Sequence, residues 1–205
     1  MQNGGRGYLA GRKIYTYMDG KKRVCFCAPH AVHSFVHKQE RSRDVGTGAI
    51  VQYLEKQQGF SSIIRNKFVP HKELISDFIL KNKLENHFFL DIHGMKAHKD
   101  FDLAIGTGCL PREKYTLILS KIRKLCRKYK IKYRLNLPQY TGKVGLTGRL
   151  QKELKKPNVL QLEFAPLFRD IDENAIQEKT IPFLIELGYF INDKGGKHVK
   201  NARKN

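Results

Sequence analysis

The sequence is poor in acidic residues, and it lacks any long apolar run. Asp and Glu number 19 against 39 Lys and Arg, so the formal net charge is +20. Such a chain carries a strong positive potential, which favours anionic partners such as nucleic acid, acidic polymers or small carboxylates. Because no run of about 18 apolar residues occurs, we expect no membrane span. The first residues lack the apolar stretch of a secretion signal, so we expect a cytoplasmic protein.

Cysteine is also scarce, and the four cysteines form no Cys-x-x-Cys pair. They are Cys25, Cys27, Cys109 and Cys126. This usage suits a reducing compartment and predicts buried or half-buried thiols that pack in the core. A length of 205 residues with 40% hydrophobic content is enough for one domain with a real core, which excludes disorder of the whole chain.

Short β-branched or aromatic runs alternate with longer segments of helical spacing, which is typical of an α/β fold. We predict one domain over residues 1–192, with a mixed, mostly parallel sheet flanked by helices, and a basic, flexible tail over residues 193–205. The predicted strands cover residues 13–17, 23–28, 61–66, 88–93, 103–105, 131–135 and 159–164. The predicted helices cover residues 47–57, 72–81, 112–129 and 176–187, with Gly188 ending the last one.

Three apolar runs end close to an ionisable residue. They are Val24-Cys-Phe-Cys-Ala-Pro-His30, Phe88-Phe-Leu-Asp-Ile-His-Gly94 and Leu160-Gln-Leu-Glu-Phe164. Strand ends are where α/β folds place ligands and catalytic groups. Because Pro29 cannot easily continue a central strand, we expect His30 to point from a loop into a crevice. Two histidines at two strand ends, with a nearby carboxylate, suit a zinc site that has three protein ligands and an open position for water.

The spacing leaves the third ligand open. A His-x-x-Glu motif fails, because the third residue after His30 is His33. Asp44 and Glu40 are the nearest downstream carboxylates, and Asp44 could instead cap a helix. The loop residues His33 and His37 could also contact substrate or metal.

A carboxylate close to His93 could orient its imidazole by a hydrogen bond. Asp91 precedes His93 by two positions and shares its face in a regular strand, and Asp102 follows later. Asp102 could instead cap the turn at residues 106–108.

Four motifs, taken in order, support a family assignment. They are Pro29-His30, Asp44-x-x-Thr47-Gly-Ala-Ile50, Asp91-Ile-His-Gly94 followed by Phe101-Asp-Leu-Ala-Ile-Gly-Thr107, and Gln161-Leu-Glu163. Together they resemble the N-formylglutamate amidohydrolase family, whose fold is related to that of zinc carboxypeptidases and aspartoacylases. The resemblance covers roughly residues 24–190. It implies that His30, Asp44 and His93 bind Zn²⁺ and that Glu163 is the catalytic carboxylate. The chain departs from the family in its short length, its Lys-rich middle, and His33 and His37.

These assignments make a coherent hydrolytic site. Zinc would lower the pKa of a bound water from about 16 toward ~7, and Glu163 could accept its proton and pass it to the departing amine. An arginine could stabilise the oxyanion or bind a substrate carboxylate through its planar fork. We predict Arg43 for catalysis, and we predict substrate contacts for Arg41, Arg149, Thr147 and His33. Arg149 follows the Gly-rich stretch 141–148, which we expect to form a loop over the substrate.

The sequence thus predicts a zinc-dependent amidohydrolase acting on a small anionic carboxylate substrate of the N-formylglutamate kind. A zinc peptidase or a cell-wall amidase would use the same centre. The third possibility is a polyanion-binding or nucleic-acid-binding protein with an idle site, because residues 121–134 hold eight cations and no acid. On a helix these charges form mostly a solvated face, and no known nucleic-acid-binding motif accompanies them. Nucleic acid is therefore not the favoured partner.

Overall fold

The computed structural model describes residues 14–32, 34–36, 39–41, 43–67, 74–169 and 174–201. For residues 34–36, 39–41 and 195–201 only the course of the backbone is considered.

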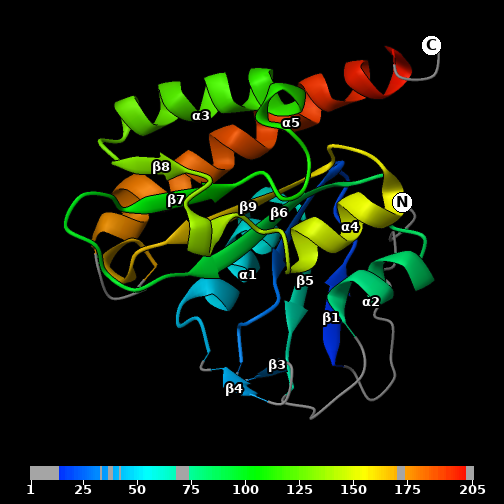
Figure 1. Cartoon of the computed structure of the whole chain (residues 1–205), viewed down its shortest axis with the longest axis horizontal. Coiled ribbons are helices and arrows are strands. Elements are labelled where there is room, and N and C mark those ends of the chain that lie inside the picture. Colours follow the sequence, from blue (N-terminus) through cyan, green and yellow to red (C-terminus); the bar gives the residue numbers. More distant parts are fainter. Residues whose placement is uncertain are drawn as a thin grey trace, which may run out of the picture.

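A seven-stranded sheet lies at the centre of the fold, with strand order β1-β5-β2-β6-β9-β7-β8 (Figure 1). Its strands are β1 (Tyr15–Met18), β2 (Val24–Ala28), β5 (Ser61–Arg65), β6 (Phe88–Gly94), β7 (Leu103–Gly106), β8 (Tyr133–Leu135) and β9 (Val159–Phe164). The central strands β5, β2, β6 and β9 are parallel, whereas β1 and β7 run antiparallel to their inner neighbours and β8 is parallel to β7. This confirms the predicted mixed, mostly parallel sheet. A separate hairpin, β3 (Ser34–Val36) with β4 (Gln39–Arg41), was not predicted.

Helices cover both faces of this sheet (Figure 1). On one face lie α1 (Thr47–Gln58), α3 (Thr116–Lys128) and α5 (Ile181–Asn201), whose apolar sides share a core with Phe26, Ile92 and Leu162. On the other face lie the shorter α2 (Ile75–Lys81) and α4 (Leu146–Leu154), packed on Cys25, Cys27, Phe89 and Val159. Short helical turns lie at Arg112–Tyr115, Pro138–Tyr140, Pro166–Phe168 and Ile176–Thr180. Within the described ranges, no helix combines the length and the apolarity that crossing a membrane requires.

The alternation of side chains along β6 and β9 decides where polar groups collect. Phe89, the second residue of β6, pairs with Val159, the first residue of β9, and both side chains lie on the face covered by α2 and α4. Because successive side chains point to opposite faces, the residues two and four positions later share that face. Four polar side chains therefore occupy the middle and the carboxyl-terminal end of these two strands on this face, and all four are buried: Asp91, His93, Gln161 and Glu163.

Two helices differ from the prediction. The stretch 141–148, expected as a loop, becomes helical at Leu146, because Leu146 and Leu150 form an apolar stripe that packs on the sheet. The last helix does not end at Gly188. A Cβ at Gly188 would come within 2.7 Å of the Phe60 ring, so glycine lets α5 approach the sheet closely there. The helix continues to Asn201, into the first part of the predicted tail.

The cysteines are all free, and three of the four are buried as expected. Cys109 is exposed, which corrects the expectation that it packs in the core. It follows β7 in a turn whose Cys109 and Leu110 amides donate hydrogen bonds to the Gln151 side chain.

Candidate active site

The candidate site lies where the parallel strands β2, β6 and β9 end. His30 follows β2, His93 is the penultimate residue of β6, and Glu163 is the penultimate residue of β9. The register of β6 and β9 pairs His93 directly with Glu163, so their side chains start side by side on one face. The sheet thus brings together three side chains that are far apart in sequence.

His93 is held from one side by a buried carboxylate. Its Nε2 lies 2.9 Å from Asp91 Oδ1, and Thr147 on α4 donates a hydrogen bond to Asp91 Oδ2 at 3.1 Å. The other candidate, Asp102, accepts a hydrogen bond from the Lys132 backbone instead. Of the two carboxylates predicted to orient the imidazole, Asp91 therefore makes the contact.

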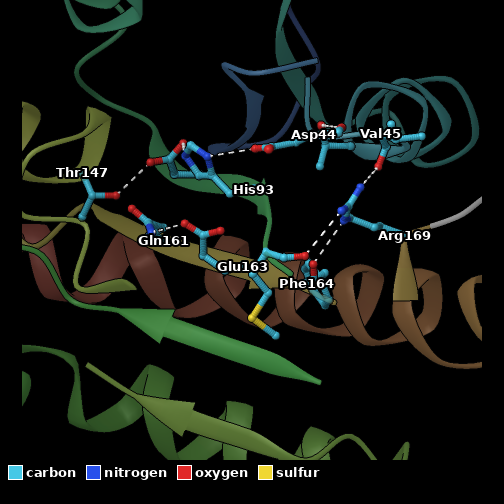
Figure 2. Close-up of polar contacts among 11 residues, drawn as sticks. Asp44, Val45, His93, Thr147, Gln161, Glu163, Phe164 and Arg169 are labelled. Atoms are coloured by element: carbon cyan, nitrogen blue, oxygen red, sulfur yellow. Dashed lines mark hydrogen bonds and ion pairs between the residues drawn. The ribbon is translucent and has the colours of Figure 1, made fainter. Parts of the chain in front are cut away.

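Asp44 approaches His93 from the opposite side (Figure 2). Its backbone N–H donates to the His30 carbonyl at 2.8 Å, and its own carbonyl accepts a hydrogen bond from Thr47 Oγ1 at 2.8 Å. These bonds fix the loop, so the Asp44 carboxylate turns inward and does not cap α1. The alternative role of Asp44 as a helix cap is not realised.

The facing atoms of Asp44 and His93 fit two ligands of one metal ion. Asp44 Oδ2 and His93 Nδ1 are 3.3 Å apart, which is close enough for an ion pair. Their alignment is not that of a hydrogen bond, and both atoms are buried without a hydrogen-bond partner among the described residues. Two ligand atoms at about 2.0–2.1 Å from a tetrahedral zinc ion are themselves about 3.3 Å apart. The separation of Asp44 Oδ2 and His93 Nδ1 therefore suits two atoms that bind the same cation.

His30 lies next to this pair. Its ring centroid is 5.0 Å from that of His93, with an interplanar angle of 50°. Two imidazoles that bind one tetrahedral ion through a ring nitrogen have centroids about 5 Å apart. In the part of the chain that the structure describes, however, no set of three or more His, Cys, Asp or Glu side chains is already arranged to hold a metal. The expected proximity of the two histidines is observed, and their role as ligands stays a prediction.

Charge decides the protonation of this cluster. Burial alone would lower the pKa of His93, but the charge of Asp91, the contacts with Asp44 and Asp91, and the charge of Glu163 hold this pKa well above its usual value. Burial raises the pKa of Asp44, but its contacts with His93, the charge of His30 and the Gly94 amide outweigh this, so the pKa lies below its usual value. Without a metal, the site therefore favours a charged imidazole between two carboxylates. A cation that binds Nδ1 has to displace that proton.

Glu163 lies beside the cluster and is only 4% exposed. Gln161, two positions earlier on the same face, donates a hydrogen bond from Nε2 to Glu163 Oε1 at 2.7 Å (Figure 2). This contact fixes one carboxylate oxygen. The position suits a group that exchanges a proton with a reactant bound near His93.

The remaining predicted site residues have different surroundings. Thr147 is buried and contacts Asp91, whereas Arg43 and Arg149 are exposed. His33 and His37 lie outside the described residues, as do the side chains of Glu40 and Arg41. The structure thus places Asp44 against His93 and does not describe the Glu40 carboxylate.

Sequence reasoning assigned no role to Gln161 and did not single out Arg169. Gln161 shares the face of Glu163 by simple alternation, so its position could have been read from the strand pattern. Arg169 donates hydrogen bonds to the carbonyls of Phe164, Val45 and Met95, from three separate segments (Figure 2). Nothing in the local sequence indicates these contacts.

Comparison with known proteins shows a likeness in fold. No family model matches the chain, and no curated protein matches it in sequence. A bacteriophage poly-gamma-glutamate hydrolase superposes with a TM-score of 0.53 at 15% identity, over 93% of this chain and 92% of that one. The zinc-free form of the protein YNDL gives a TM-score of 0.54 at 14% identity, over 91% and 93%.

An N-formylglutamate amidohydrolase from Ralstonia eutropha also shares the fold. It gives a TM-score of 0.54 at 10% identity, over 88% of this chain and 99% of that one. The predicted resemblance to this group is therefore confirmed for the fold. The chain is a single-domain α/β protein that shares the fold of these two solved hydrolases.

Proposed function

We propose that this protein is a zinc-dependent hydrolase that cleaves an amide C–N bond in an anionic substrate. The observation that carries the proposal is the buried pair of Asp44 Oδ2 and His93 Nδ1, which face each other at 3.3 Å and have no hydrogen-bond partner among the residues that the structure describes. His30 beside this pair and Glu163 next to it complete a set that can bind a metal and move a proton. The solved hydrolases that share the fold support the reaction class.

His30, Asp44 and His93 would hold the ion. Asp91 accepts a hydrogen bond from His93 Nε2–H, so Nδ1 is the nitrogen that would bind the cation once it has lost its proton. Thr147 fixes Asp91 in turn. When bound, zinc supplies a water of lowered pKa and polarises the amide carbonyl.

Glu163 performs the proton transfers. Its carboxylate accepts the proton of the attacking water as the new C–O bond forms at the amide carbon. It then delivers this proton to the amide nitrogen as the C–N bond breaks, so the products are a carboxylic acid and an amine. The hydrogen bond from Gln161 to Oε1 orients the carboxylate that exchanges the proton.

Charge favours an acidic substrate. The chain has a formal net charge of +20, and a positive field raises the encounter rate with anions. Two of the fold relatives are hydrolases of poly-gamma-glutamate and N-formylglutamate, both of which carry carboxylates. Arg43 and Arg149 are exposed and thus accessible to such a group. We propose a small carboxylate-bearing amide as substrate. We also propose a cytoplasmic location, which is in keeping with the free cysteines.

Elemental analysis combined with one substitution tests the proposal. The purified protein should contain, or take up, one zinc ion per chain and lose activity on chelation. Glu163→Gln should keep the zinc and lose about 10²–10⁴-fold in turnover, because it removes the proton acceptor. Glu153→Gln, an exposed glutamate on α4, is the matched control and should leave turnover unchanged.

The outcomes separate the alternatives. A protein that neither contains nor binds zinc contradicts the metal site, and turnover that survives in Glu163→Gln contradicts the assigned base. A panel of N-formyl and N-acyl amino acids, γ-glutamyl peptides and muramoyl peptides distinguishes an amidohydrolase from a peptidase or a cell-wall amidase.

A binding function is the second candidate, because α3 carries cations on its exposed side. Arg123, Lys124 and Arg127 are all exposed there. Steeply salt-dependent binding of DNA or RNA by a protein that binds no zinc would favour this function. Simultaneous replacement of the three cations by Gln should then reduce both the affinity and its salt dependence.

A further inference from the structure

Arg169 ties together the ends of the segments that carry the site. Its Nε donates to the carbonyl of Phe164 at 3.2 Å, its Nη1 to that of Val45 at 2.5 Å, and its Nη2 to that of Met95 at 3.4 Å. Phe164 ends β9, Met95 directly follows β6, and Val45 directly follows Asp44 (Figure 2). One guanidinium group therefore joins the Glu163 strand, the His93 strand and the Asp44 loop.

Two glycines make room for this arginine. A Cβ at Gly94 would lie 2.6 Å from Arg169 Nε and 2.7 Å from its Cζ, so the guanidinium packs directly on the Gly94 backbone. At Gly46 a Cβ would lie 1.6 Å from the Arg169 carbonyl oxygen, and the φ of 86° at this residue also favours glycine. The backbone on both sides of the site is thus fitted closely around Arg169.

Arg169 contacts the chain neighbours of both Asp44 and His93. Gly94, on whose backbone the guanidinium packs, directly follows His93 in the chain. Val45, whose carbonyl accepts from Nη1, is the neighbour of Asp44 on the other side. Arg169 therefore fixes each of the two segments at the residue next to a facing side chain. A planar group with donors in a fixed fork suits this task, because it can bind carbonyls that diverge in direction.

We infer that Arg169 is a positioning residue that holds Asp44 and His93 at the separation a divalent metal ion requires. This inference rests on the proposed function. This positioning role differs from that of an arginine that binds a substrate carboxylate, since Nε, Nη1 and Nη2 of Arg169 each donate to a backbone carbonyl. A positioning role predicts an effect on metal affinity in the absence of substrate, whereas a substrate-reading role predicts an effect on KM alone.

Zinc affinity, measured by competition with a chromophoric chelator, tests the inference without relying on activity. Arg169→Ala should weaken zinc binding by about 10–100-fold, the range typical of residues that orient metal ligands. Arg169→Lys, which keeps the charge but not the fork, should restore only part of the affinity. In turnover assays at saturating zinc, kcat should fall more than KM rises. Arg112→Ala, an exposed arginine in the turn Arg112–Tyr115, is the matched control and should bind zinc as the wild type does.

A second variant serves if Arg169→Ala does not fold. Gly94→Ala retains the arginine but displaces its guanidinium, and it should cause a comparable loss of zinc affinity. Unchanged zinc affinity in the folded Arg169 variants, with or without a rise in KM, overturns the positioning role while leaving the proposed function intact. Failure of the wild-type protein to bind zinc overturns both.

Discussion

Replacing Asp91 by Asn tests whether one buried charge controls both the protonation of His93 and the affinity for metal. Asp91 is fully buried, and its two oxygens contact His93 Nε2 at 2.9 Å and the Thr147 hydroxyl at 3.1 Å. Asparagine keeps the size and an acceptor for His93, but it removes the negative charge. The substitution thus separates the charge from the packing.

The expected loss of zinc affinity is about 10–100-fold, because carboxylates that hold a ligating imidazole typically contribute that much. This corresponds to about 1.4–2.7 kcal/mol of binding free energy. The binding should be measured by chelator competition near pH 8, and circular dichroism should show that the variant remains folded.

The metal-free protein should also show a pH signature. The charge of Asp91 is the first of the causes that raise the His93 pKa against the opposing effect of burial. A pKa that is higher in the folded state stabilises the protein fully below the unfolded value of about 6.5, and this contribution is lost as pH rises through the folded value. In EDTA, the difference in unfolding free energy between the wild type and Asp91→Asn should therefore be largest at acidic pH and should shrink as the solution becomes alkaline.

Urea unfolding at a series of pH values measures this difference. Asp102→Asn is the matched control, because Asp102 contacts the Lys132 backbone and not the imidazole. Asp91 does not control these properties if Asp91→Asn changes neither the zinc affinity nor the pH dependence, or if Asp102→Asn has the same effect on both.

Two further predictions concern stability. Gly188→Ala should destabilise the protein by about 1–3 kcal/mol, because the added methyl group meets the Phe60 ring at 2.7 Å, whereas Gly145→Ala meets nothing closer than 3.9 Å and should change little. Equal effects of these two substitutions in urea unfolding would argue against close packing of α5. Tyr115→Phe should cost about 1–3 kcal/mol, since its buried hydroxyl donates to the Val159 carbonyl and accepts from Gln151. The exposed Tyr53→Phe is the control, and a neutral Tyr115→Phe would show that these bonds add no net stability.

Strand positions could be predicted because they depend on local chemistry. Val159–Phe164 was placed with its observed bounds, since its apolar residues are buried on both faces of a central strand. The local sequence pattern gave a wrong prediction where a residue contacts a part of the chain that is far away in sequence. Gly188 looked like a helix end, but its missing side chain admits Phe60, which is far away in sequence. Leu146 lies in the Gly-rich stretch 141–148 that was expected to form a loop, but the sheet provides a surface on which Leu146 and Leu150 pack together.

The side chains that reach the ends of the strands can be read from local sequence pattern alone. The period of two along a strand places Asp91 with His93 and Gln161 with Glu163 on one face, whatever the rest of the chain does. The groups that these side chains contact depend on how distant segments of the chain fold together. Asp44 faces His93 because a loop is fixed by hydrogen bonds to His30 and Thr47, and Arg169 joins three segments through backbone carbonyls. Every residue has a backbone carbonyl, so contacts to carbonyls cannot be predicted from the identity of the side chains. They become visible only in the folded chain.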